Sequence, residues 1–104
     1  MAQFDVYEND EPESKEVIPF LLDVQHGVHK HLATRTVIPL VIPFPAKQEA
    51  KKLFPRFNIL DSEVVMSTPE ISGYPVRDLR TKVCSLAENR LEILDAIDVL
   101  LGGF

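Results

Sequence analysis

The last part of the chain carries apolar residues at the spacing of an amphipathic helix. Four fall on one side of such a helix and two lie beside them: Leu86, Ile93, Ile97 and Leu100, flanked by Leu94 and Leu101. Ser85 and Glu88 have the spacing of a capping box, which predicts that the helix begins directly after Ser85. Gly102 suits the left-handed position that ends many helices. The chain therefore has one terminal helix to pack against whatever precedes it.

The region before this helix breaks into short segments typical of strands. They are residues 3–7, 17–25, 35–42, 57–60, 64–68 and 73–76, with a short helix or turn at 46–53. Residues 3–7 and 17–25 read as a hairpin, and Pro39 predicts an edge or a bulge because it cannot donate to a ladder. Several short strands followed by one helix indicate an α+β domain built on an antiparallel sheet or small barrel.

Composition indicates one domain over residues 1–104, because 104 residues with 45% hydrophobic content can bury an ordinary core. The single Cys84 excludes an internal disulfide. No basic segment followed by an apolar run opens the chain, and Pro39, Pro43 and Pro45 interrupt its most apolar region. We therefore expect a cytoplasmic protein that does not cross a membrane.

Charge is unevenly distributed around a net value of −5. Residues 30–60 contain six basic residues and one acidic residue, Glu49. The basic residues are Lys30, Arg35, Lys47, Lys51, Lys52 and Arg56. The acidic residues gather in residues 8–16 and in the predicted helix. A basic middle can attract an acidic protein or a nucleic acid, or can simply be a solvated face. The acidic chain as a whole argues against broad nucleic-acid affinity.

Several of these segments carry a family resemblance. The matching residues are Gln3-Phe4, Val6-Tyr7, Leu22-Asp23-Val24-Gln25, Arg35, Val37-Ile38-Pro39-Leu40, Pro75-Val76 and Ala96-Ile97. In order and spacing they resemble the CcdB family of plasmid and chromosomal toxins over essentially the whole chain. Asp-Val-Gln followed by Val-Ile-Pro-Leu at this separation is the most specific part of the pattern.

The resemblance implies a homodimer with an SH3-like barrel related to the Kid and MazF toxins, and it implies no cofactor. It also implies a binding inhibitor, not an enzyme, which contacts the A subunit of DNA gyrase, traps the cleaved-DNA complex and is neutralised by a CcdA-type antitoxin. The implied gyrase-contacting positions are Gly102, Gly103, Phe104, Asp95, Asp98, His26, Val28 and His29.

The chain departs from the family at this proposed contact. Toxic members carry a tryptophan where Gly102 stands, and buried aromatics of this kind often dominate interfaces. Asp95 and Asp98 occupy positions where active members can carry amides. Phe104 can supply an aromatic two residues later, at a cost in ordering entropy. Weakened poisoning, a different target site and a non-toxic homologue all stay open.

A competing chemistry lies in His26, His29 and His31, three imidazoles within six residues. Imidazoles can act as acid and base in RNA cleavage, and Arg35 could stabilise the phosphorane, as in a Kid- or MazF-like ribonuclease. The same histidines could bind a transition metal, although no second His or Cys cluster completes a zinc site. The third interpretation is a solvated loop that touches the target.

Overall fold

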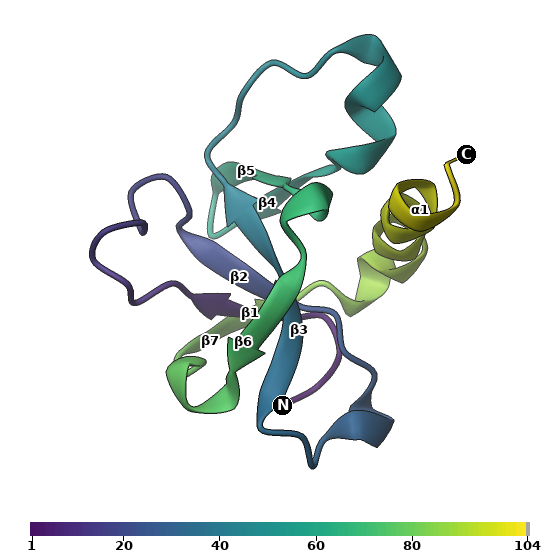
Figure 1. Ribbon diagram of the computed structural model, residues 1–104. Helices are drawn as coiled ribbons and strands as arrows, with labels where there is room; N and C mark the ends of the chain where they lie inside the picture. The colour runs from purple at the N-terminus through teal and green to yellow at the C-terminus, as the bar shows by residue number, and fades with distance from the viewer. Residues whose placement is uncertain (104) are drawn as a thin grey trace.

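The computed structural model describes residues 1–103, and it consists of a curled antiparallel sheet with one helix at its C-terminal end (Figure 1). Its strands and helix are β1 (Asp5–Glu8), β2 (Phe20–Asp23), β3 (Thr34–Val41), β4 (Arg56–Ile59), β5 (Ser62–Met66), β6 (Ser72–Pro75), β7 (Lys82–Ser85) and α1 (Arg90–Gly102). The sheet curls into a half-barrel. The α+β prediction is confirmed, and no helix of residues 1–103 is long and apolar enough to cross a bilayer.

β3 is the central strand of the sheet, whose order is β4-β5-β3-β2-β1-β7 with β6 also on β3. One edge of β3 pairs with β2. The other edge pairs with β6 over Thr34–Val37 and with β5 at Leu40 and Val41. Of the two alternatives predicted at Pro39, the edge position is therefore wrong, because β3 has partners on both sides. Pro39 lies where β3 changes partners, so its missing N–H coincides with a break in the ladder.

The predicted hairpin of β1 and β2 is confirmed, with Val6 opposite Leu22. β2 is shorter than the predicted segment 17–25, because residues 12–17 form turns. Asn9 organises these turns: its Nδ2 donates to the carbonyl of Ile18 at 2.8 Å and to Ser14 Oγ at 2.9 Å. Such local side-chain bonds to the backbone compete with strand pairing.

The start of the helix was predicted too early. Ser85 is the last residue of β7, which pairs with β1, and its Oγ accepts from the amide of Ala87 at 3.1 Å instead of capping a helix. A 3-10 turn, η5 (Ala87–Asn89), separates it from α1. The predicted stop is one residue early as well, because Gly103 takes the left-handed position with φ +79°. β7 escaped prediction because its burial does not alternate.

α1 lies against the core of the half-barrel through Ile93 and Ala96, which are buried with residues of several strands. Leu94 and Ile97 are half-buried beside them, as the apolar pattern predicts. Leu101 is different, because its side chain is 79% exposed. The C-terminal end of α1 therefore extends beyond the sheet that anchors its middle.

The N-terminal residues fasten the start of α1 to the end of β2. Phe4 is buried with φ +72°, donates its amide to the carbonyl of Asp23 at 2.6 Å and accepts from the amide of Leu86 at 2.8 Å. The guanidinium of Arg90 lies 5.6 Å from the Phe4 ring centroid and donates to Gln3 Oε1 at 2.9 Å. This cation–π contact and hydrogen bond fix the direction in which α1 leaves the sheet.

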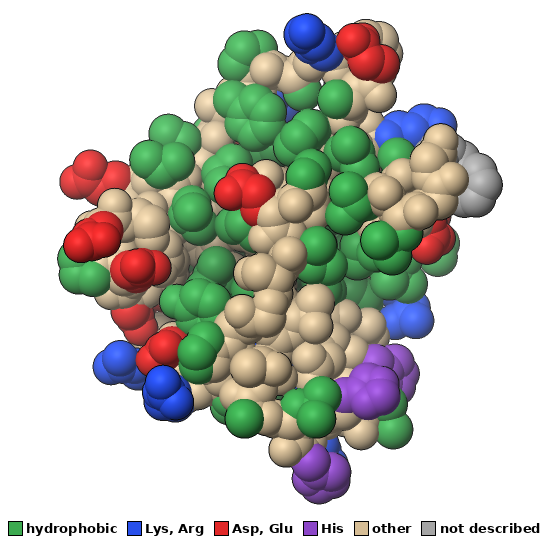
Figure 2. All heavy atoms as spheres, in the orientation of Figure 1, with side chains coloured by type: hydrophobic (Ala, Val, Ile, Leu, Met, Phe, Trp, Pro, Cys, Tyr) green, Lys and Arg blue, Asp and Glu red, His purple; other side chains and the backbone are tan. Residues whose placement is uncertain are grey.

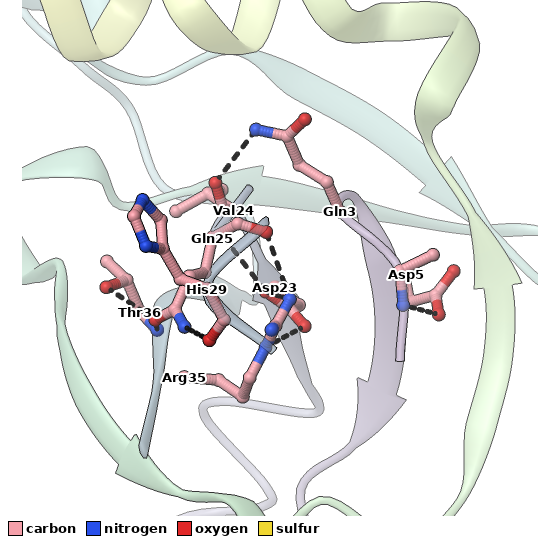
Figure 3. A network of polar contacts seen from close by, with 9 residues as sticks. Gln3, Asp5, Asp23, Val24, Gln25, His29, Arg35 and Thr36 are labelled. Atoms are coloured by element: carbon pink, nitrogen blue, oxygen red, sulfur yellow. Dashed lines mark hydrogen bonds and ion pairs between the residues drawn. The ribbon is translucent and has the colours of Figure 1, made fainter. Parts of the chain in front are cut away.

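A buried ion pair joins β2 to β3 beneath the loop that follows β2 (Figure 3). Arg35 Nε and Nη2 donate to the two carboxylate oxygens of Asp23 at 2.8 and 3.0 Å, and the side chains are 1% and 0% exposed. Nη2 also donates to the carbonyl of Gln25 at 3.0 Å. Burial raises the pKa of Asp23, while the bonds from Arg35 and from the Gln25 amide oppose that rise.

Gln25 extends this network to the surface. Its Oε1 accepts from the amide of Thr36 at 2.9 Å, and its Nε2 donates to the carbonyl of His29 at 3.0 Å. The loop carrying the histidines is thereby tied to the buried pair (Figure 3).

We predict that Asp23→Asn lowers the free energy of unfolding by about 3–5 kcal/mol, because it leaves the buried guanidinium of Arg35 without its counter-charge. Urea denaturation of the two proteins measures this difference. Glu63→Gln is the matched control, since it breaks the exposed ion pair with Arg56 and should cost under about 1 kcal/mol. Equal small losses in both variants would contradict the prediction.

A second prediction concerns the two-residue turn between β4 and β5. Ile59 pairs with Ser62, and both turn residues have positive φ, +51° at Leu60 and +67° at Asp61. Asn-Gly suits such a turn far better, so Leu60→Asn with Asp61→Gly should raise the free energy of unfolding by about 1 kcal/mol. Leu32→Asn, at another exposed leucine whose φ is not positive, should give no such gain in the same urea titration.

Candidate functional site

The middle of α1 borders a groove of about 650 Å³ whose opposite wall is the 3-10 helix η2 (Gln48–Leu53). The groove is lined by Lys51, Lys52, Pro55, Glu92, Asp95, Asp98 and Val99. We call this hollow the α1–η2 groove. It places two predicted contact residues, Asp95 and Asp98, opposite two lysines that lie more than 40 residues earlier in the chain.

The helix leads directly into the predicted C-terminal contact. Gly102 is the exposed last residue of α1, and Gly103 caps it with its amide donating to the carbonyl of Val99 at 2.9 Å. A Cβ at Gly103 would meet no atom within 4 Å, so the positive φ is what favours glycine there. Phe104 lies outside the described residues.

The α1 wall of the groove is electrostatically unfavourable on its own. Glu92, Asp95 and Asp98 follow one another at i,i+3 spacing, which places like charges side by side. No basic residue lies in the last turn of α1, where a cation would complement the helix dipole. Carboxylates on this wall thus favour a cation from another part of the structure or from a partner.

The other predicted contact residues lie on the 3-10 helix η1 (Gly27–His29) after β2. His26 Nδ1 accepts from the amide of Val28 at 3.1 Å, so this imidazole begins the turn. Val28 is 68% exposed, and His29 is exposed as well. The histidines form a separate corner of the surface in Figure 2, coloured purple.

The structure does not bring the two predicted patches together within one protomer. Gln3 links the end of β2 to the start of α1, because it donates to the carbonyl of Val24 and accepts from Arg90. Gly102 lies twelve residues after Arg90, which is roughly 18 Å along a helix. η1 accordingly lies at the bottom of Figure 1, while the end of α1 lies near the upper right.

The ribonuclease arrangement is contradicted at Arg35. Its guanidinium is buried and bound to Asp23, so it cannot stabilise a phosphorane in solvent beside the histidines. The metal interpretation has no support in residues 1–103, where no three His, Cys, Asp or Glu side chains are grouped to hold an ion. The third interpretation, a solvated loop, agrees with the exposure of residues 26–31.

The basic middle of the sequence is not one basic face. Arg35 belongs to the core, and Arg56 pairs with Glu63 at 2.9 Å and donates to the carbonyl of Phe44 at 2.7 Å. Lys51 and Lys52 of this segment line the α1–η2 groove, and the sequence alone does not place them beside the helix.

Cys84 lies half-buried in β7, where burial raises the pKa of its thiol.

Comparison with known proteins gives one family. The family model described as CcdB protein matches residues 3–103. No curated protein matches the chain. Because the matched residues cover almost all of the 104-residue chain, and because the fold is a half-barrel with a C-terminal helix, this chain belongs to the CcdB family, the toxins of toxin–antitoxin systems.

Proposed function

We propose that this toxin acts in the cytoplasm by binding the A subunit of DNA gyrase and trapping the cleaved-DNA complex, and that a CcdA-type antitoxin neutralises it. The observation that carries the proposal is the exposed side of α1, which leads to the exposed Gly102 at its C-terminal end. Ile93 and Ala96 anchor the middle of the helix, whereas Asp95, Asp98 and Gly102 remain free to meet a partner.

The proposed contact consists of two patches. The first is the end of α1, with Asp95, Asp98, Gly102 and Gly103, and with Phe104 beyond it. The second is the η1 loop, with His26, Val28 and His29. The action is binding: these side chains recognise the target, and the chemistry on DNA belongs to gyrase. Neither patch requires a cofactor.

A homodimer is the assembly that we propose for binding. Membership of the family supports this assembly, in which the two C-terminal helices lie near a shared axis. In a symmetric pair each patch occurs twice, so one molecule can contact both halves of a two-fold symmetric target.

A second candidate function rests on Gly102. An interface that has lost its central aromatic loses much of its affinity. The chain can therefore be a CcdB-family member whose gyrase poisoning has weakened or disappeared, with the fold retained.

We predict that Gly102→Trp increases trapping of cleaved DNA by tenfold or more, since a large rigid side chain adds buried area at the end of α1. Purified gyrase, supercoiled plasmid and a dilution series of toxin measure the effect. Val17→Trp, at an exposed site on the 12–17 turns, is the matched control and should change nothing.

Removal of residues 102–104 in the same assay should abolish trapping without lowering the free energy of unfolding by more than a few tenths of a kcal/mol. Equal trapping by the truncated and full-length proteins would contradict the proposed contact. If the Gly102→Trp variant traps cleaved DNA and the wild type does not, the second candidate function is established.

Light scattering should give a mass of twice 11.8 kDa at micromolar concentrations. A wild-type mass of 11.8 kDa throughout this range would contradict the dimer.

A further inference from the structure

We propose that a pocket between the β1–β2 loop and the 3-10 helix η3 (Thr68–Glu70) binds an alkyl guanidinium. This is the group that an arginine side chain shares with small free guanidines. None of the proposed gyrase-contacting residues lines the pocket. The site is therefore independent of the proposed function and adds a second binding surface to the protein.

β3 creates the pocket by changing partners. It pairs with β6 as far as Val37, which lies opposite Ser72, and with β5 from Leu40 onward. Pro39 lies between the two pairings, and its carbonyl accepts from the amide of Ser67 at 3.0 Å. Residues 67–71 lie outside the strands at this fork, and a hollow of about 210 Å³ adjoins them. We call this hollow the fork pocket.

The floor of the fork pocket is apolar. It is formed by Leu21 of β2 with Val37 and Pro39 of β3, all of them buried. Leu21 and Val37 belong to an apolar cluster separate from the one that holds α1. At about 210 Å³ the pocket is smaller than the about 300–1,000 Å³ typical of drug-sized ligands, so it suits a group the size of one long side chain.

Two carboxylates line the pocket from different segments, Glu11 from the β1–β2 loop and Glu70 from η3. Their carboxylate oxygens accept from serine hydroxyls, Glu11 from Ser14 at 3.4 Å and Glu70 from Ser67 at 2.7 Å. A hydroxyl leaves the negative charge uncompensated. Neither glutamate takes part in an ion pair of 4.0 Å or less within residues 1–103, and no lysine or arginine of that range lines the pocket. The pocket therefore favours a cation.

Tyr74 gives the pocket an aromatic side chain. It also lines an adjoining hollow of about 360 Å³, together with Asp10, Asp78 and Arg80. Burial and the charges of Glu11, Asp78 and Asp10 raise the pKa of Tyr74, so the phenol is neutral in a negative surrounding potential. Figure 2 shows acidic side chains gathered on the left of this face, over the β1–β2 loop. An aromatic ring beside carboxylates favours an organic cation.

The loop wall is ordered before any ligand binds. Asn9 is buried, its Nδ2 donates to the carbonyl of Ile18 at 2.8 Å, and its Oδ1 accepts from the amide of Glu11 at 3.0 Å. Its own amide donates to the carbonyl of Pro19 at 3.0 Å. Because these bonds fix the backbone that carries Glu11, binding costs less ordering entropy.

A guanidinium suits the pocket better than an ammonium group. It is planar and carries several N–H donors in fixed directions, so one guanidinium can donate to two carboxylates at once. It also stacks on aromatic rings and is more weakly hydrated than an ammonium group. The alkyl chain of the ligand would cover the floor formed by Leu21 and Val37.

NMR titration of the ¹⁵N-labelled full-length protein tests the inference with three probes. N-acetylarginine N-methylamide presents the guanidinium as an arginine in a peptide does, and agmatine presents it on a small free molecule. N-acetylcitrulline N-methylamide has the same shape as the first probe without the charge. The guanidinium probes should shift the amide signals of Glu11, Glu70 and Ser72 with dissociation constants of about 1 mM, and citrulline should bind about tenfold more weakly or less. The tighter of the two guanidinium probes identifies the source of the ligand.

Variants locate the charge that is recognised. Glu11→Gln with Glu70→Gln keeps the acceptor oxygens but removes both charges, and should weaken binding of the arginine probe by about tenfold or more. Glu13→Gln with Glu16→Gln makes the same change in net charge on the 12–17 turns, at exposed residues that do not line the pocket, and should bind like the wild type. Thermal unfolding without ligand confirms that each variant keeps its fold.

Three results would overturn the inference. Equal binding of the arginine and citrulline probes would show that the pocket does not recognise charge. Equal weakening by the two glutamine pairs would show a general attraction to an acidic surface. The third is the absence of shifts at the pocket across a millimolar titration. The citrulline comparison uses the unmodified protein, so it decides the matter even where a variant fails to fold, and no result depends on gyrase.

Discussion

The buried pair of Asp23 and Arg35 is the interaction on which the rest of the structure depends. It joins the two strands at the centre of the half-barrel with both side chains removed from water. Burial of two opposite charges is favourable only when their geometry and remaining hydrogen bonds are good. The carbonyl of Gln25 supplies one further acceptor, whereas Arg35 Nη1 is buried without a hydrogen-bond partner among residues 1–103. The register of β2 against β3 and the path of the histidine loop follow from this pair.

The anchoring of α1 explains why its C-terminal end is available. The Phe4 carbonyl and Arg90 fix the start of the helix, and Ile93 and Ala96 fix its middle. Beyond Ala96, Asp98, Leu101 and Gly102 are exposed, and the last turn contains no basic residue. A segment with these properties adds little to stability and is suited to recognition.

The architecture could be predicted from the sequence because apolar runs, Pro39 and the helical spacing near Ile93 are local signals. The exact bounds of the strands and of the helix could not be predicted. β7 and the late start of α1 depend on the pairing of β7 with β1, which satisfies backbone groups that a capping box at Ser85 would have used. The left-handed Leu60 is likewise imposed by strand pairing and not by its own preference.

The site was predictable only in part. Asp95, Asp98 and Gly102 follow from the family resemblance together with the helix, and all three are exposed residues of α1. Arg35 was misassigned because a single arginine in a sequence carries no sign of its burial. The α1–η2 groove could not be predicted, because it joins residues more than 40 positions apart through tertiary packing.

The central claim is that gyrase A binds the exposed residues of α1 together with the η1 loop. Hydrogen–deuterium exchange of the full-length toxin, with and without the gyrase A subunit, tests it directly. The account predicts slower exchange in α1 and in Gly27–His29, with the strands unchanged. Slower exchange confined to the 12–17 turns, or none in α1, would contradict it.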